Sequence, residues 1–259
     1  STGYWTAAKP RDLNSQFSNL NSFFCGGAAD PLFNKGVPMI LVQNLICEFP
    51  DGEGKKLRAL SVPSFSLEDG GLAVITGPSG TGKTTFLHCL SGMLTPSYGD
   101  ITIGDVQLTN LSKEERCRFR AEKVGYVFQK PLLLSWLTVK ENIRLSAKLA
   151  GRSADDDEIE GLLADVGLSG MGDRKTGHLS GGQQQRVSFL RAVVRHPSLL
   201  LADEPTASLD EENGKKLMDI MLEYQKKSGA TLLCATHDKR VMDLFPKRYD
   251  VQKGGFLPC

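Results

Sequence analysis

Short apolar runs alternate with amphipathic stretches along most of the chain. Five runs predict strands, at residues 39–48, 72–76, 124–128, 199–203 and 231–236. Most of them are followed by a stretch with helical spacing of apolar positions. Because strands that alternate with helices pair in parallel, the pattern predicts an α/β fold with a largely parallel sheet.

The helices are marked by their first residues. Ser112 and Thr138 each precede a Glu by three positions, which is the capping-box pattern. They predict helices at residues 112–123 and 138–151. A third helix should begin at the acidic run 155–157, since carboxylates suit the positive end of a helix dipole.

Further helices are predicted at residues 83–91 and 183–195, and another ends at Gly229. The apolar face of the last helix consists of Leu217, Ile220, Met221 and Tyr224. The stretch 130–183 lacks strand patterns and interrupts the alternation, so it predicts an all-helical lobe.

A glycine-rich loop follows the predicted strand 72–76. It reads Gly77, Pro78, Ser79, Gly80, Thr81, Gly82, Lys83, Thr84. This is the pattern G-x-x-x-x-G-K-[ST] between a strand and a helix, as a phosphate-binding loop requires. Its backbone N–H groups would converge on phosphate oxygens, Lys83 would add a positive charge, and the Thr84 hydroxyl would ligate Mg²⁺.

An acidic pair ends the apolar run 199–203. Asp203 and Glu204 follow three leucines and an alanine and precede Pro205. Parallel strands bring their carboxyl ends to one edge of a sheet, so this pair should lie beside the phosphate loop. Asp203 can then hold Mg²⁺ through water, and Glu204 can polarise an attacking water molecule.

A second glycine motif precedes the predicted helix 183–195. It consists of Leu179, Ser180, Gly181, Gly182 and Gln183. Its hydroxyl and N–H groups at a helix start would form a second anion site. One nucleotide does not need two such sites in one chain. Two chains arranged head to tail would use both, each phosphate loop meeting the other chain's Ser180 segment.

With these motifs in this order, residues 39–255 resemble the nucleotide-binding subunit of an ABC transporter. The resemblance implies an α/β P-loop NTPase fold, with a RecA-like, mostly parallel sheet, flanking helices, a small antiparallel β subdomain and an inserted all-helical subdomain. It divides the chain into an N-terminal extension (1–37), a nucleotide-binding core (38–129 and 184–259) and the helical subdomain with the signature motif (130–183).

The resemblance also assigns roles to single residues. Glu204 would be the catalytic base, with Lys83 and His237 at the γ-phosphate. Phe49 would stack on adenine, and Asp210 would lie at the interface between two subunits. ATP-binding residues would be Phe49, Gly77, Pro78, Ser79, Gly80, Thr81, Gly82, Lys83, Thr84, Thr85, Gln129, Asp203, Ser180, Gly181, Gly182, Gln183 and Asp210. Mg²⁺ would be held by Thr84, Gln129 and Asp203.

In this family, two ATP-Mg complexes close a homodimer, and hydrolysis reopens it. The resemblance places separate transmembrane permease subunits against a segment from about Lys130 to Leu145. It implies a peripheral subunit on the cytoplasmic face of the inner or plasma membrane, with indirect membrane contact and no nucleic acid. Residues 125–129, 137–143 and 202–210 resemble the lipoprotein-releasing, macrolide-exporter and glycolipid-exporter group. One departure is that the Glu which usually precedes the strand before the phosphate loop is missing, and Gly70, Gly71 and Leu72 stand there.

Composition agrees with this picture. Of 259 residues, 31 are Lys or Arg and 30 are Asp or Glu, so the net charge of +1 argues against a protein that coats nucleic acid. No apolar run approaches the roughly 18 residues of a membrane span. Six scattered cysteines without zinc spacing favour free thiols in a reducing compartment.

Two alternatives remain at this point. One is a non-transport ABC-class ATPase in translation or DNA repair, although such proteins carry tandem domains or a long coiled-coil insertion. The other is a binding module without hydrolysis, although Lys83, Glu204 and His237 are all retained. The extension 1–37 is rich in Asn, Ser and Phe. Its aromatic rings predict that the extension docks through them, and no role is assigned to it.

Overall fold

The structure, a computed structural model, describes residues 38–50, 56–252 and 255–258. A six-stranded sheet has the order β10-β9-β3-β8-β7-β6. Its strands are β3 (Leu72–Thr76), β6 (Val124–Val127), β7 (Leu199–Asp203), β8 (Thr231–Ala235), β9 (Lys247–Gln252) and β10 (Gly255–Pro258). All neighbours pair in parallel except β10, which is antiparallel to β9. The predicted parallel sheet is confirmed.

Alternate residues of the central strands face two different cores. In β7, Leu199 and Leu201 belong to one apolar cluster, and Leu200 and Ala202 belong to the other. All four side chains are fully buried. A strand covered on both faces reads as a continuous apolar run, which is why the sequence pattern identified it.

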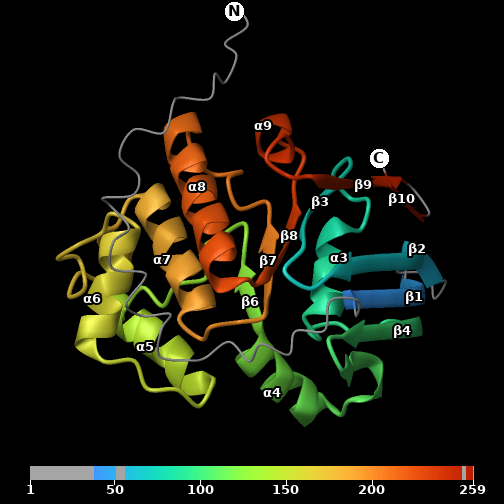
Figure 1. Cartoon of the computed structure of the whole chain (residues 1–259), viewed down its shortest axis with the longest axis horizontal. Coiled ribbons are helices and arrows are strands. Elements are labelled where there is room, and N and C mark those ends of the chain that lie inside the picture. Colours follow the sequence, from blue (N-terminus) through green and yellow to red (C-terminus); the bar gives the residue numbers. More distant parts are fainter. Residues whose placement is uncertain (1–37, 51–55, 253–254, 259) are drawn as a thin grey trace, which may run out of the picture.

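Helices cover both faces of this sheet (Figure 1). Helices α7 (Gly181–Val193) and α8 (Glu211–Ser228) lie on one side, with α5 (Val139–Leu149) and α6 (Asp156–Asp165) beyond α7. Helix α3 (Lys83–Leu90) lies on the other side. The remaining helices are α4 (Lys113–Lys123), α9 (Lys239–Met242) and the 3-10 turns η2 (Leu108–Asn110) and η3 (Thr176–His178).

A four-stranded antiparallel sheet packs beyond α3, in the order β2-β1-β4-β5. Its strands are β1 (Pro38–Pro50), β2 (Lys56–Glu68), β4 (Tyr98–Ile103) and β5 (Val106–Gln107). Only β1 was predicted from its own pattern. Strand β2 contains Pro63 and shifts register opposite Cys47 and Glu48, so its alternation is interrupted and the sequence pattern missed it.

Several predicted boundaries were wrong by one or two residues. Helix α7 begins at Gly181 rather than 183, because Ser180 is its N-cap and the two glycines form its first turn. Strand β6 ends at Val127, one residue early, and α5 ends at Leu149. The helices α5 and α6 share one apolar cluster with the sheet and with α7 and α8.

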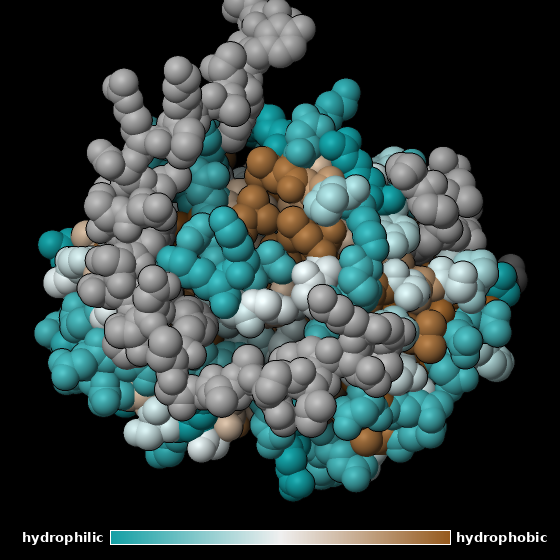
Figure 2. Space-filling model, in the orientation of Figure 1, coloured by the Kyte–Doolittle hydropathy of each residue, from teal (hydrophilic) through white to brown (hydrophobic). Residues whose placement is uncertain are grey.

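The visible face in Figure 2 is mostly hydrophilic, with apolar atoms gathered near the middle, around α8, α9 and β8. Within the described residues, no helix is both long and apolar enough to cross a membrane. Cys47, Cys89 and Cys234 are free and buried, as expected of small apolar side chains.

Candidate functional site

The phosphate loop connects β3 to α3 and is organised around Lys83. This side chain is only 7% exposed. Its Nζ donates hydrogen bonds to the backbone carbonyl oxygens of Gly77 (2.7 Å) and Pro78 (2.9 Å). The Thr81 hydroxyl also donates to the Pro78 oxygen, at 2.9 Å. The lysine charge is therefore held inside the curve of the loop.

Two glycines of the loop have conformations that other residues rarely adopt. Gly77 has φ of 141° and Gly82 has φ of 98°. A Cβ atom at Gly77 would lie 2.6 Å from the carbonyl oxygen of Val251, and one at Gly82 would lie 2.8 Å from that of Ala59. Glycine is required at both positions by backbone geometry and by space.

Asp203 lies at the end of β7 and is 6% exposed. Burial raises its pKa above the usual value, and a hydrogen bond with the Thr84 side chain partly offsets the rise. Its Oδ1 has no hydrogen-bond partner among the described residues. A buried carboxylate oxygen without a donor, beside a threonine hydroxyl, suits a hydrated Mg²⁺. These two side chains fit a magnesium site.

Glu204 and His237 form the second half of the site. The Nδ1 atom of His237 lies 2.7 Å from Oε1 of Glu204, and the Thr236 hydroxyl donates to Oε2 at 3.0 Å. Glu204 has a positive φ of 45°, and its backbone N–H donates to the carbonyl oxygen of Ala235. This conformation, which is uncommon for a side chain such as Glu, turns the carboxylate from the strand end towards Lys83, 4.0 Å away.

These groups surround a cleft of about 270 Å³. Its lining consists of Ala59, Ser79, Gly80, Gly82, Lys83, Thr84, Thr85, Gln129, Glu204 and His237. The cleft thus brings Lys83, Thr84 and Thr85 together with Gln129, Glu204 and His237. Its lining does not include Phe49, Gly77, Pro78, Thr81 or Asp203. A donor-rich loop, a lysine and a carboxylate–imidazole pair can together bind phosphate groups and take a proton from water.

The Ser180 segment lies elsewhere and does not line this cleft. The Ser180 hydroxyl accepts a hydrogen bond from the backbone N–H of Gln183, and the Gln183 side chain accepts one from that of Ser180. Asp210 caps α8 and accepts two hydrogen bonds from Asn213. A Cβ at Gly182 would meet the Asn213 side chain at 3.0 Å. The signature motif and the Asp210 loop therefore form one surface.

Phe49 lies near the end of β1 and is 39% exposed. It pairs with Leu57 of β2, which is 65% exposed. Leu45 and Cys47 precede it on the same face of β1, and both are buried. Phe49 thus continues an apolar row past the edge of the core.

Sequence reasoning missed three residues of the site. Thr236, which holds Glu204, directly precedes His237, and a hydroxyl at a strand end was its only signal. Ala59 lines the cleft from the unpredicted strand β2. Tyr126 lies close enough to Asp203 that burial and this carboxylate raise the pKa of its phenol.

Comparison with known proteins places this geometry in a family. The family model described as ABC transporter matches residues 60–207. The lipoprotein-releasing system ATP-binding protein LolD of Legionella pneumophila is 38% identical over 203 residues, covering 78% of this chain and 89% of LolD. The macrolide export ATP-binding/permease protein MacB of Campylobacter jejuni is 36% identical over 221 residues, covering 85% of this chain and 34% of MacB.

Among solved structures, the ATP-binding cassette MJ0796, a dimer in a post-hydrolysis state with ADP and Pi, has a TM-score of 0.78 to this chain. It is 30% identical, and the match covers 84% of this chain and 96% of that one. Membership of this family implies dimerisation and a membrane permease partner, and it favours transport over the alternative in translation or DNA repair. The chain belongs to the ABC transporter family, as a subunit that binds and hydrolyses ATP.

Proposed function

We propose that Glu204 is the general base of ATP hydrolysis and that His237 contacts the γ-phosphate. The observation that carries this proposal is the 2.7 Å contact between them at the cleft that contains Lys83. Glu204 would take a proton from the attacking water, whose oxygen bonds to the γ-phosphorus as ADP leaves. Since Nδ1 of His237 faces Glu204, Nε2 is the ring nitrogen that would meet the phosphate.

The other predicted site residues would bind the nucleotide and its metal ion. Lys83 and the loop N–H groups would hold the phosphates, and Phe49 would stack on adenine. Asp203, Thr84 and Gln129 would hold Mg²⁺, which neutralises charge on the β- and γ-phosphates when it is bound. The orphaned Oδ1 of Asp203 supports this placement.

We infer that two copies of this chain bind head to tail. The Ser180 segment lies outside the cleft of its own chain, and its first-turn glycine Gly181 has open space around it. In the dimer, this segment would close the cleft of the partner, with Asp210 beside it. The dimeric state of MJ0796 supports the arrangement.

A groove of about 610 Å³ would receive the permease. Its apolar lining includes Phe128, Leu132 and Leu149, and its charged lining comprises Arg118, Arg120, Arg191, Arg195 and Glu122. Four arginines against one glutamate favour a partner segment that carries carboxylates. The groove shares Leu132 with the segment from about Lys130 to Leu145 and extends beyond it onto α4, α5 and α7.

The wider function is release or export of a lipid, lipoprotein or small molecule, at the cytoplasmic face of the inner or plasma membrane. The names of LolD and MacB support this class of cargo. Such a transporter would use ATP binding to close the dimer and hydrolysis to reopen it.

Glu204→Gln tests the base. This variant should bind ATP with little change in affinity, lose at least about a hundredfold in kcat, and accumulate as an ATP-bound dimer. Turnover by phosphate release and dimer fraction by size-exclusion chromatography are the measurements. Wild-type turnover in Glu204→Gln would rule out this residue as the base.

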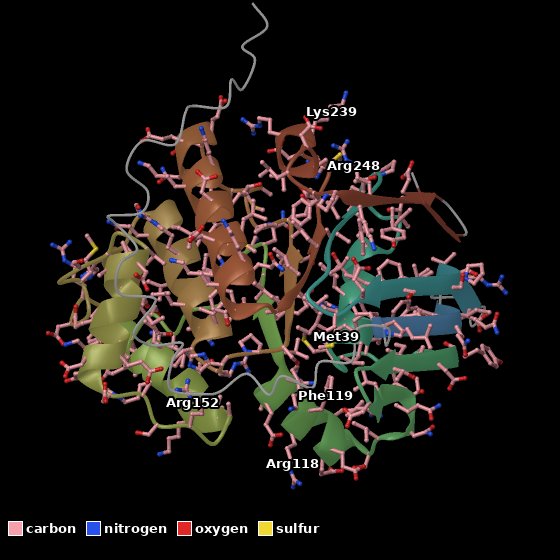
Figure 3. All side chains as sticks on the ribbon, viewed as in Figure 1. Met39, Arg118, Phe119, Arg152, Lys239 and Arg248 are labelled. Carbon is pink, nitrogen blue, oxygen red and sulfur yellow. The ribbon has the colours of Figure 1, made fainter. Side chains whose placement is uncertain are left out.

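Arg118→Glu tests the groove. Arg118 projects from α4, at the opposite end of the molecule from Arg248 (Figure 3). Reversing its charge should weaken capture of an integral membrane partner from detergent-solubilised membranes and leave basal ATP hydrolysis unchanged. Arg248→Glu is the matched control and should capture the partner normally. Equal capture by both variants would argue against the groove.

A further inference from the structure

One glutamine of α7 contacts the backbone beside Gln129. Gln185 follows the signature segment by two residues, and its side chain is completely buried. Its Nε2 donates a hydrogen bond of 2.8 Å to the carbonyl oxygen of Phe128. Phe128 follows β6 and directly precedes Gln129, which lines the ATP cleft. The bond therefore joins the signature helix to the edge of the cleft.

Core stability does not explain a glutamine at this position. Its other amide atom, Oε1, has no hydrogen-bond partner among the described residues. Burying a half-satisfied amide costs free energy that an apolar side chain of similar length would avoid. The hydrogen bond from the amide to the Phe128 carbonyl oxygen instead explains why a glutamine stands here.

The backbone after Phe128 is also hydrogen-bonded to α7 and to the turn that precedes the signature. Arg191, also on α7, donates to the carbonyl oxygen of Leu132. The Thr176 hydroxyl, from the turn just before the signature, donates to that of Leu134 at 3.0 Å. This segment has no helix or strand of its own between β6 and α5. Side-chain hydrogen bonds therefore contribute to fixing its path.

We propose that Gln185 is a positioning residue for ATP hydrolysis. It holds the Phe128 carbonyl and thereby sets Gln129 relative to the Ser180 end of α7. When α7 shifts, the backbone at Phe128 shifts with it, so that Gln129 reaches the metal site as the signature segment reaches its phosphate. The inference rests on the proposed role of Gln129 at Mg²⁺.

Gln185→Met removes the donor and keeps the length of the side chain. We expect kcat to fall about ten- to a hundredfold, because small misplacement of a side chain at the reacting centre is costly. KM for ATP should change less than about twofold, because Gln185 does not line the cleft. The matched control is Gln225→Met on α8. Gln225 donates the same kind of bond to the carbonyl oxygen of Gly70, at 3.0 Å. Its loss should leave kcat unchanged.

A double-mutant cycle identifies the route of the effect. Gln129→Ala should lower kcat by itself, and Gln185→Met should add almost nothing in that background. Fully additive losses would overturn the positioning role and leave the proposed function intact. Wild-type kcat in Gln129→Ala would instead overturn the role of Gln129, and this inference with it.

Thermal melts of every variant check that it folds. If Gln185→Met melts more than about 10 °C below Gln225→Met, Gln185→Leu replaces it in the cycle. Leucine carries no hydrogen-bond donor in any protonation state, so it should give a similar loss in kcat. Normal kcat in a folded Gln185→Leu protein would overturn the proposal.

Discussion

Asp165 ends α6 in a buried position, with 8% of its surface exposed. Burial raises its pKa to about 6, although Lys227 opposes the rise. Its Oδ1 has no partner among the described residues. The folded protein therefore binds a proton here more tightly than the unfolded chain does. This carboxyl adds stability at low pH, and the contribution is lost as the pH rises through about 6.

Asp165→Asn should therefore stabilise the protein at pH 8. We expect the free energy of unfolding to rise by about 1–2 kcal/mol there, and the gain should vanish near pH 4, where the carboxyl is protonated. Urea unfolding at the two pH values is the measurement. Asp105→Asn, at an exposed turn residue, is the control and should change little. A gain that is equal at both pH values would contradict this explanation.

At the scale of elements, three helices begin with capping boxes. The first residues of α4, α5 and α7 are capped by Ser112, Thr138 and Ser180 respectively. The first two were identified from sequence as helix starts. The third was interpreted as an anion site, and the structure adds that its hydroxyl also caps α7. One side chain thus serves the helix and, in the proposed dimer, the nucleotide.

Ser112→Ala should lower the free energy of unfolding by about 1 kcal/mol, because the N–H of Glu115 loses its acceptor. Ser112→Asp restores an acceptor and should recover most of the loss. Both values come from denaturant unfolding of the two variants in parallel with wild type. Equal stability of Ala and Asp at this position would show that the cap contributes nothing.

At the scale of the whole molecule, the cleft and the signature surface are separate in one chain. The cleft holds Lys83 and Glu204, whereas Ser180 and Asp210 lie outside it. In the proposed head-to-tail dimer, each chain would supply one half of each of two sites. The two halves can therefore be mutated separately.

Mixing two inactive variants should restore activity. Lys83→Ala removes the positive charge from the phosphate loop. Gly181→Asp places a carboxylate where the partner's phosphate would bind, in space that the fold leaves open. Each heterodimer has one intact composite site, so an equal mixture should reach about a quarter of the wild-type rate. A mixture no more active than its components would argue against composite sites.

The sequence predicted those parts of the fold and the site that depend on consecutive residues. The phosphate loop from Gly77, the acidic pair at Asp203 and the buried strands all have local patterns, because glycine conformations and full burial leave a local mark. Strand β2 was missed, since Pro63 and a register shift break its alternation. The partners Thr236 and Ala59 were missed because nothing near them in the chain marks their contacts.

The sequence by itself determined which motifs are present: a phosphate loop, an acidic pair that ends at Glu204 and a signature before α7. Only the tertiary structure decided which of these groups meet. It brought His237 to Glu204 across 33 positions and Gln185 to Phe128 across 57, and it kept Ser180 away from its own cleft. The physical reason is that motifs are local arrangements of backbone and side chains, whereas such contacts depend on how the sheet and helices pack.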